Sequence, residues 1–346
     1  MDDRIDILLA TYNGERFLAE QLDSVIAQSH TNWRILARDD GSSDGTVDLL
    51  KGYKRQLGDK LDILEDARGN LGLAANFSAL MGASDAQYAA FCDQDDVWLP
   101  EKLALGLKAV QALELQWGRD TPCLSFSDLE IVDEDLRQVA PSFWHYENLA
   151  PDKADRLSRL LAKNAVTGCT TVLNRALITR AAPIPDGIIL HDWWVALVAA
   201  SFGHVEPISQ ATIKYRQHTT NDTGARRYRI AYFVIGLFKF LHRYVRNAGR
   251  QRGIFSHYST HYNQAETFST LFREELTPEM QELIAGFLNI PYKTLFTRAL
   301  FLSKNGIYPR GLVNALAFFC LYNASSMGLA RPHESPRRTQ SNAQHS

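Results

Sequence analysis

The sequence predicts an α/β fold in which a mainly parallel sheet is flanked by helices, with a helical extension toward the C-terminal end. Short apolar runs alternate with segments of helical periodicity through the first half of the chain, a pattern typical of βαβ units. Polar, turn-forming clusters follow directly on three of these runs. The 346 residues are 45% hydrophobic and 22% charged, so the chain can bury a large core and is not a disordered, collagen-like or coiled-coil protein.

The elements of the first half follow from its apolar periodicity. We expect strands at residues 5–10, 33–37, 61–64 and 88–92, and amphipathic helices at residues 15–28, 44–56, 71–84 and 99–115. After Pro122 the pattern becomes mixed. There we expect strands at residues 123–129 and 168–173, a polar loop to about residue 152, and a helix at His191–Phe202.

Charge divides the chain near Gly224. The first 224 residues hold 21 Lys and Arg against 33 Asp and Glu, whereas the remaining 122 hold 16 against 6. We therefore expect a first domain at residues 1–224, a basic helical region at 225–330, and a disordered tail at 331–346, which has almost no apolar side chains.

The basic region suggests an acidic partner. Lys239, Arg243, Arg246 and Arg250 share one helical face beside many apolar residues, as in helices that bind an anionic membrane surface. The alternative is a surface helix with a solvated charged face. No nucleic-acid reader motif occurs, so we expect no nucleic-acid partner.

The expected location is the cytoplasm, at the inner face of the membrane. The chain enters its first strand directly after Met-Asp-Asp, without the features of a signal peptide. Residues 311–330 are uncharged but contain Asn and Ser, which fits a buried or interfacial helix better than a membrane span. Four scattered cysteines favour a reducing compartment and argue against structural zinc.

The polar clusters should meet at one edge of the sheet. Thr11-Tyr12-Asn13-Gly14 follows the first expected strand, Asp39-Asp40-Gly41-Ser42 the second, and Asp93-Gln94-Asp95-Asp96 the fourth. In open α/β sheets, ligands bind outside the carboxyl ends of the strands. Neither G-x-G-x-x-G nor a phosphate-loop motif is present, so a diphosphate would need another form of charge neutralisation.

Three carboxylates within four residues, Asp93, Asp95 and Asp96, suggest a site for Mg²⁺ or Mn²⁺. The alternative is that these acids cap the helix expected near Pro100, because Asp is a favoured N-cap residue.

With these residues, the chain resembles the family 2 glycosyltransferases of the nucleotide-binding GT-A fold, over about residues 5–224. The resemblance implies a nucleotide half at residues 1–122 and an acceptor half at 123–224. It implies that Tyr12 stacks on the nucleobase, that Asp40 bonds the base, and that Asp95 and Asp96 form the metal site, with Asp96 the direct ligand. Asp93 and Asp95 form a literal D-x-D, which leaves the ligand assignment open. The other implied nucleotide-sugar contacts are Thr11, Asn13, Asn70 and Asn76.

The resemblance also implies a catalytic base where His191-Asp192-Trp193-Trp194 opens a helix. We expect Asp192 to deprotonate the acceptor hydroxyl, with a helix N-cap as its alternative role. Trp193 and Trp194 would stack on sugars or lie in the core, and His191 would lie at the acceptor. Tyr215-Arg216-Gln217-His218 resembles the end of the catalytic domain, where His218 would bind the metal or the diphosphate and Arg216 would neutralise phosphate charge.

The implied activity is that of an inverting, metal-dependent glycosyltransferase. The motifs are most similar to the rhamnosyltransferase-type subgroup, which implies transfer from dTDP-L-rhamnose to a lipid-linked or membrane-tethered saccharide in cell-surface polysaccharide synthesis. Two alternatives are a nucleotidyltransferase that makes nucleotide-sugars, which should have a basic Gly-rich loop near the first strand, and a non-catalytic saccharide-binding or assembly protein with a relict site.

Overall fold

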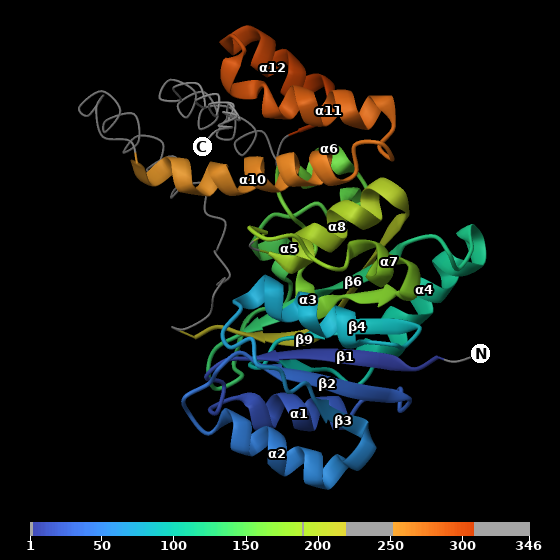
Figure 1. Cartoon of the computed structure of the whole chain (residues 1–346), viewed down its shortest axis with the longest axis vertical. Coiled ribbons are helices and arrows are strands. Elements are labelled where there is room, and N and C mark those ends of the chain that lie inside the picture. Colours follow the sequence, from blue (N-terminus) through green and yellow to red (C-terminus); the bar gives the residue numbers. More distant parts are fainter. Residues whose placement is uncertain (1–2, 189, 219–251, 308–346) are drawn as a thin grey trace, which may run out of the picture.

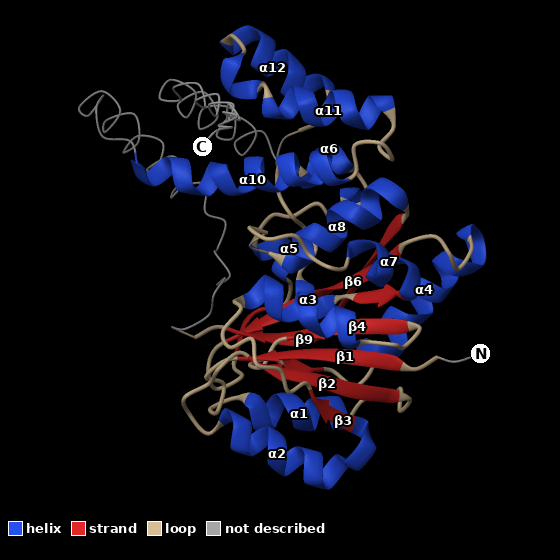
Figure 2. Ribbon diagram, in the orientation of Figure 1, coloured by secondary structure: helices blue, strands red, loops and turns tan. Residues whose placement is uncertain are grey.

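The computed structural model describes residues 3–188, 190–218 and 252–307 (Figure 1). Within these residues the centre of the fold is a nine-stranded sheet of order β3-β2-β1-β4-β8-β6-β9-β5, with β7 paired to β6 (Figure 2). The predicted basic face at 239–250, the stretch at 311–330 and the tail at 331–346 lie outside the described residues.

The first four strands form the parallel part of the sheet, as the sequence predicts. These strands are β3 (Leu61–Ile63), β2 (Trp33–Asp39), β1 (Ile5–Thr11) and β4 (Tyr88–Cys92). In β1, Ile7 and Leu9 face one core while Leu8 and Ala10 face the other. Burial on both faces explains why the strand reads as a continuous apolar run.

The second half of the sheet is mixed. β8 (Val172–Asn174) is antiparallel to both β4 and β6 (Cys123–Val132), and β6 is parallel to β9 (His204–Arg216). β5 (Val97–Trp98) and β7 (Gln138–Ala140) add short antiparallel pairs. The thirteen-residue β9 has only partial apolar alternation, and periodicity does not identify it.

Helices cover both faces of the sheet. α1 (Leu18–Ile26), α2 (Thr46–Leu57) and α4 (Lys102–Trp117) contribute to one core, and α3 (Leu73–Ala83), α7 (Arg175–Ala181) and α8 (His191–Phe202) to the other. Figure 1 shows α1 and α2 far from α8 and the C-terminal helices. The short helices are α5 (Phe143–Tyr146), α6 (Leu157–Leu160) and the 3-10 turns η1 (Gly58–Lys60), η2 (Pro151–Lys153), η3 (Gly168–Thr170) and η4 (Ile290–Tyr292).

The C-terminal extension is helical, as predicted, over the part that is described. It consists of α10 (Arg252–Leu271), α11 (Pro278–Leu288) and α12 (Leu295–Lys304), and its apolar side chains join the core of α8. The Trp194 ring lies 5.7 Å from that of Phe268 and 6.0 Å from that of Phe272. None of the helices in the described ranges is both long and apolar enough to cross a bilayer.

Candidate active site

The predicted polar clusters meet at the carboxyl edge of the parallel strands. The last residues of β1 and β2, Thr11 and Asp39, are neighbours in register, and the Thr11 hydroxyl donates to Asp39 Oδ1 at 2.9 Å. Gln94, from the turn after β4, pairs with the backbone of Tyr12 through its carbonyl oxygen at 2.8 Å and its amide nitrogen at 2.9 Å. The turns that follow three separate strands therefore form one connected surface.

Tyr12 is exposed on this surface, and the Asn13 side chain supports the surface through a hydrogen bond. The Tyr12 residue is 51% exposed, which leaves its ring open to a stacking partner. Asn13 adopts a left-handed φ of 49° and its side-chain oxygen accepts a hydrogen bond from the Ser43 amide at 2.8 Å. A Cβ at Gly14 would lie 2.2 Å from the side-chain oxygen of Gln94, so a larger residue there would displace the side chain that pairs with Tyr12.

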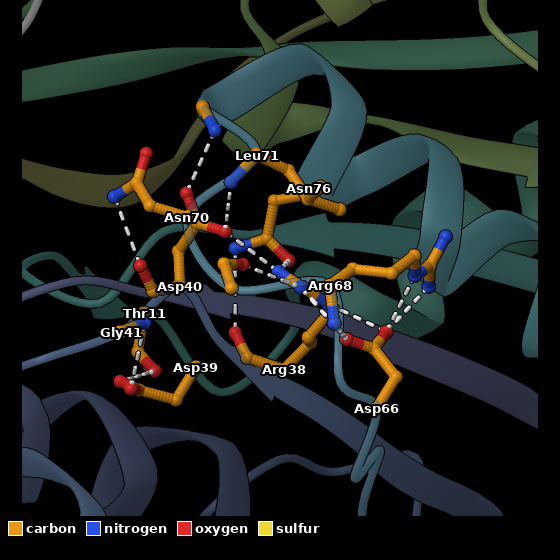
Figure 3. Close-up of polar contacts among 12 residues, drawn as sticks. Thr11, Arg38, Asp39, Asp40, Gly41, Asp66, Arg68, Asn70, Leu71 and Asn76 are labelled. Carbon is orange, nitrogen blue, oxygen red and sulfur yellow. Dashed lines mark hydrogen bonds and ion pairs between the residues drawn. The ribbon is translucent and has the colours of Figure 1, made fainter.

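Asp40 ties the end of β2 to the loop before α3 (Figure 3). Its carboxylate accepts hydrogen bonds from the amides of Leu71 and Gly72, each at 2.8 Å, and from Arg38 Nη1 at 2.6 Å. The Asn70 side chain donates to the Asp40 carbonyl at 2.9 Å. Asp40 is 4% exposed, and because a carboxylate has about four acceptor positions, one position remains for a further hydrogen bond.

Asn76 does not reach this surface. It is 2% exposed on α3, where its side chain accepts a hydrogen bond from Arg38 Nη1 and donates one to the Arg38 carbonyl, each at 3.3 Å. The expectation of a direct nucleotide-sugar contact is corrected to a supporting role, because Asn76 is buried and its side chain is bonded to Arg38.

The acidic cluster forms the turn between β4 and β5 and does not cap a helix. α4 begins at Lys102 after Glu101, with no side-chain cap. Asp96 is fully buried, and its Oδ1 accepts a hydrogen bond from the Arg216 amide at 3.1 Å. Its Oδ2 is also buried and has no nitrogen or oxygen donor bonded to it among the described residues. Burial, together with the charges of Asp95 and Asp93, raises the pKa of Asp96 well above its usual value.

The structure divides the predicted metal ligands between two adjacent groups. Donor atoms of Asp93, Asp96 and Cys169 lie within 4.8 Å of one another. Asp95 instead pairs with His218 Nε2 at 2.8 Å, and the His218 ring lies 5.0 Å from that of Phe17. The carboxylate oxygens of the first group, one of them buried without a donor, fit a divalent cation.

Arg216 is buried and supports the residues around it. This corrects its expected contact with a diphosphate. It is 1% exposed at the end of β9. Its guanidinium donates to the Asp95 carbonyl at 2.9 Å and the Glu134 carbonyl at 2.6 Å, and it pairs with the Glu20 carboxylate. Because these bonds attach the acidic turn to the end of β9, Arg216 fixes the position of Asp95 and Asp96.

Asp192 lies at the start of α8 but is not its N-cap, which is Leu190. Its Oδ2 accepts a hydrogen bond from the Gly168 amide at 3.0 Å, and its Oδ1 accepts from Asn164 Nδ2 at 3.2 Å. Burial raises the pKa of Asp192 to about 6. A carboxylate with a pKa near neutrality is suited to act as a general base.

Two consecutive residues link Asp192 to the acidic cluster. Gly168 donates to Asp192, and Cys169 places its thiol beside Asp93 and Asp96. Because adjacent Cα atoms are about 3.8 Å apart, the η3 turn brings the base candidate and the cation candidate to the same part of the sheet edge. The sequence did not predict that Cys169 lies beside the acids, because this contact joins residues far apart along the chain.

The other residues of the His191-Trp194 motif belong to the core, which agrees with the alternative expected for Trp193 and Trp194 and corrects the expected acceptor contact of His191. Trp193 and Trp194 are 7% and 0% exposed, and their indole N–H groups donate to the carbonyls of Leu160 and Ala181. His191 is 4% exposed, its ring stacks on Phe77 at 3.8 Å, and burial lowers its pKa to about 3. The helical period of α8 turns these side chains toward the core while Asp192 faces the η3 turn.

The chain is similar to several known proteins. A family model described as glycosyl transferase family 2 matches residues 6–116, which include β1 to β5 and the acidic turn. The dTDP-rhamnosyl transferase RfbG of Shigella flexneri is 27% identical over 245 residues, covering 67% of this chain and 79% of that protein. The UDP-Glc:alpha-D-GlcNAc-diphosphoundecaprenol beta-1,3-glucosyltransferase WfgD of Escherichia coli is 31% identical over 181 residues, covering 51% of this chain and 63% of that protein.

A solved structure supports the fold. Residues 1–349 of TarS from S. aureus, crystallised with UDP-GlcNAc, match 94% of this chain and 92% of that chain, with a TM-score of 0.52 and 14% identity. The predicted GT-A architecture with C-terminal helices is confirmed.

Proposed function

The chain belongs to glycosyltransferase family 2 and is a glycosyltransferase, and from this premise we propose that it transfers a sugar from a nucleotide-sugar donor with inversion at the anomeric carbon. The observation that carries the proposal is the η3 turn, whose residues Gly168 and Cys169 touch Asp192 and the Asp93–Asp96 pair respectively. In this proposal, the base for the acceptor and the site for the leaving diphosphate lie side by side. This arrangement supports transfer over the alternatives of nucleotidyl transfer and a relict binding site.

In the proposed reaction, the oxygen of the acceptor hydroxyl attacks the anomeric carbon from the face opposite the leaving nucleoside diphosphate. Asp192 takes the proton of that hydroxyl. The hydrogen bond from the Gly168 amide orients the carboxylate. Burial places the pKa of Asp192 at about 6, so the group is ionised at neutral pH but still basic enough to accept a proton.

Mg²⁺ or Mn²⁺ would be held by Asp93 and Asp96, with Asp95 and His218 adjacent. The bound ion would supply Lewis-acid stabilisation of the charge on the diphosphate. The fit rests on the buried Oδ2 of Asp96, which lacks a nitrogen or oxygen donor among the described residues.

The donor base would lie between Tyr12 and Asp40. The exposed Tyr12 ring offers a stacking surface, and Asp40 retains one acceptor position for a base N–H. Thymine and uracil both carry such an N–H at N3. We place dTDP-L-rhamnose first, in keeping with the motif resemblance and with the name of the Shigella flexneri relative.

The proposed acceptor is a lipid-linked saccharide in bacterial surface-polysaccharide synthesis, reached from the cytoplasmic face of the membrane. The name of the Escherichia coli relative includes a diphosphoundecaprenol acceptor. The excess of 16 basic over 6 acidic residues after Gly224 would attract an anionic surface. Liposome co-sedimentation should require anionic lipid and weaken with salt, and binding that is indifferent to both would favour the solvated-face alternative.

The donor site is tested by thermal shift with dTDP, UDP, GDP and CDP, each with Mn²⁺ or with EDTA. Wild type is compared with Asp96→Ala and with Asp120→Ala, a control that removes an exposed acid before β6, at the opposite edge of the sheet. A hundredfold excess of ligand over its dissociation constant should stabilise the wild type by about 2.7 kcal/mol. The shift should need Mn²⁺, disappear in Asp96→Ala and persist in Asp120→Ala. No shift in the folded wild type with any of the four nucleotides would contradict the proposed donor site.

A further inference from the structure

Arg38, the second-last residue of β2, is 2% exposed and has every donor of its guanidinium bonded. Nε and Nη2 donate to the two oxygens of Asp66, each at 3.0 Å. Nη2 also donates to the Gly69 carbonyl at 2.9 Å, and Nη1 donates to Asp40 at 2.6 Å and to Asn76 at 3.3 Å. A guanidinium has five N–H groups in a fixed fork, and here all five have acceptors.

These bonds connect both ends of the loop between β3 and α3. Arg38 binds its first part through Asp66 and Gly69, and Asp40, held by the same guanidinium, binds the amides of Leu71 and Gly72 (Figure 3). The ion pairs with Arg38 and Arg68 keep the pKa of Asp66 well below its usual value, so this end stays charged at neutral pH. One side chain therefore sets the distance between the loop and the end of β2.

We propose that Arg38 is a positioning residue that holds Asp40 and the loop at residues 66–72 in the geometry that binds and selects the nucleobase, without touching the nucleotide itself. This inference rests on the proposed nucleotide-sugar site. Three of the four acceptor positions on Asp40 are directed by Arg38 and the loop, so the direction of the remaining one depends on this clamp. Lysine carries three donors and no planar fork, and it cannot reproduce the five bonds.

The same strand provides a matched control. Arg34 lies four residues earlier on β2, toward the opposite edge of the sheet, and is also held by acids. It donates to Asp6 at 3.2 and 2.8 Å and to Asp85 at 2.6 Å. Arg34→Lys therefore removes a comparable guanidinium clamp away from the site, and it reports what the loss of such a clamp does to the fold alone.

The experiment measures three quantities in wild type, Arg38→Lys, Arg34→Lys and the milder Asp66→Asn. These are nucleoside diphosphate affinity with Mn²⁺ by calorimetry, the ratio of affinities for the preferred nucleotide and CDP, and hydrogen exchange of the Leu71 and Gly72 amides. Arg38→Lys should weaken binding of the preferred nucleotide about tenfold or more. It should also lower the ratio of the two affinities and speed hydrogen exchange of the Leu71 and Gly72 amides. Asp66→Asn should change all three in the same direction but less. Arg34→Lys should leave affinity and loop exchange within about twofold of wild type.

The inference is overturned if Arg38→Lys matches Arg34→Lys in affinity, ratio and loop exchange. If Arg38→Lys does not fold, Asp66→Asn decides by the same criteria. If wild type binds none of the nucleotides, the proposed function fails, and the exchange of the Leu71 and Gly72 amides still shows whether Arg38 holds the loop. In a turnover assay, Arg38→Lys should raise KM for the donor and leave kcat near its wild-type value. This is expected when a substitution removes binding that is equally strong in the ground state and the transition state.

Discussion

Asp192→Asn tests the catalytic base most directly, because the substitution keeps the shape of the side chain and removes its basicity. In the structure, Asp192 accepts hydrogen bonds from Gly168, Asn164 and the Trp193 amide. Asparagine retains one acceptor oxygen, so one of these donors loses its partner at a cost of about 1–3 kcal/mol. Removal of a carboxylate whose charged form is disfavoured by burial offsets part of that loss. We expect a folded variant.

The expected pH dependence of kcat/KM follows from the pKa of Asp192, which is about 6. With that pKa, about 9% of Asp192 is ionised at pH 5 and about 91% at pH 7, so kcat/KM of the wild type should rise roughly tenfold over this range. An aspartate with its ordinary pKa would be almost fully ionised at both values, and the rate would barely change. Because the base acts in its ionised form, activity is lost as the pH falls through 6.

The assay is release of nucleoside diphosphate from the preferred donor with a lipid-linked saccharide acceptor, between pH 5 and 8. Asp192→Asn should lower kcat by about 10²–10⁴-fold, lose the rise between pH 5 and 7, and bind the nucleotide as wild type does. A variant that retains more than about a tenth of the wild-type turnover would refute the role of Asp192 as base. A wild-type profile that is flat between pH 5 and 7, measured with correctly folded protein, would refute the assigned pKa.

Substitutions at three further positions distinguish residues that bind ligands from residues that support them. Gly168→Ala should lower kcat at least tenfold and reduce thermal stability, because the new Cβ would lie 2.7 Å from His191 Nε2; wild-type kinetics would contradict the tight approach at this turn. Trp194→Ala should reduce the free energy of unfolding by about 3–5 kcal/mol in a denaturant titration and leave the KM for the acceptor unchanged below the transition, whereas a raised acceptor KM without destabilisation would restore its acceptor role. Tyr12→Ala should weaken nucleotide binding by about 1–3 kcal/mol in calorimetry and Tyr12→Phe should not, since stacking needs only the ring; equal affinities of the two variants would argue against stacking.

The sequence by itself determined the elements that depend on local pattern. Apolar runs bounded by polar turns predicted β1, β2, β3 and β4, and their parallel pairing predicted that the clusters after Ala10, Ala37 and Cys92 would meet at one edge. The 3.6-residue period predicted α8 with its observed bounds. These features can be read locally, because strand and helix periods are properties of consecutive residues.

Tertiary structure alone decided which of the polar and aromatic residues face the site. Trp193 and Asp192 are adjacent in sequence, yet one indole lies in the core and the neighbouring carboxylate faces η3. Arg216 has the residue type of a phosphate ligand, but burial and its bonds to Glu20, Asp95 and Glu134 make it a strut. Arg38 reaches the loop through Asp66, 28 residues away along the chain, and Cys169 lies beside Asp93 and Asp96, which are still more distant in sequence. Side-chain chemistry is local, whereas solvent access and the identity of the partners depend on long-range packing, and these decide whether a charged group binds a ligand or supports the residues that do.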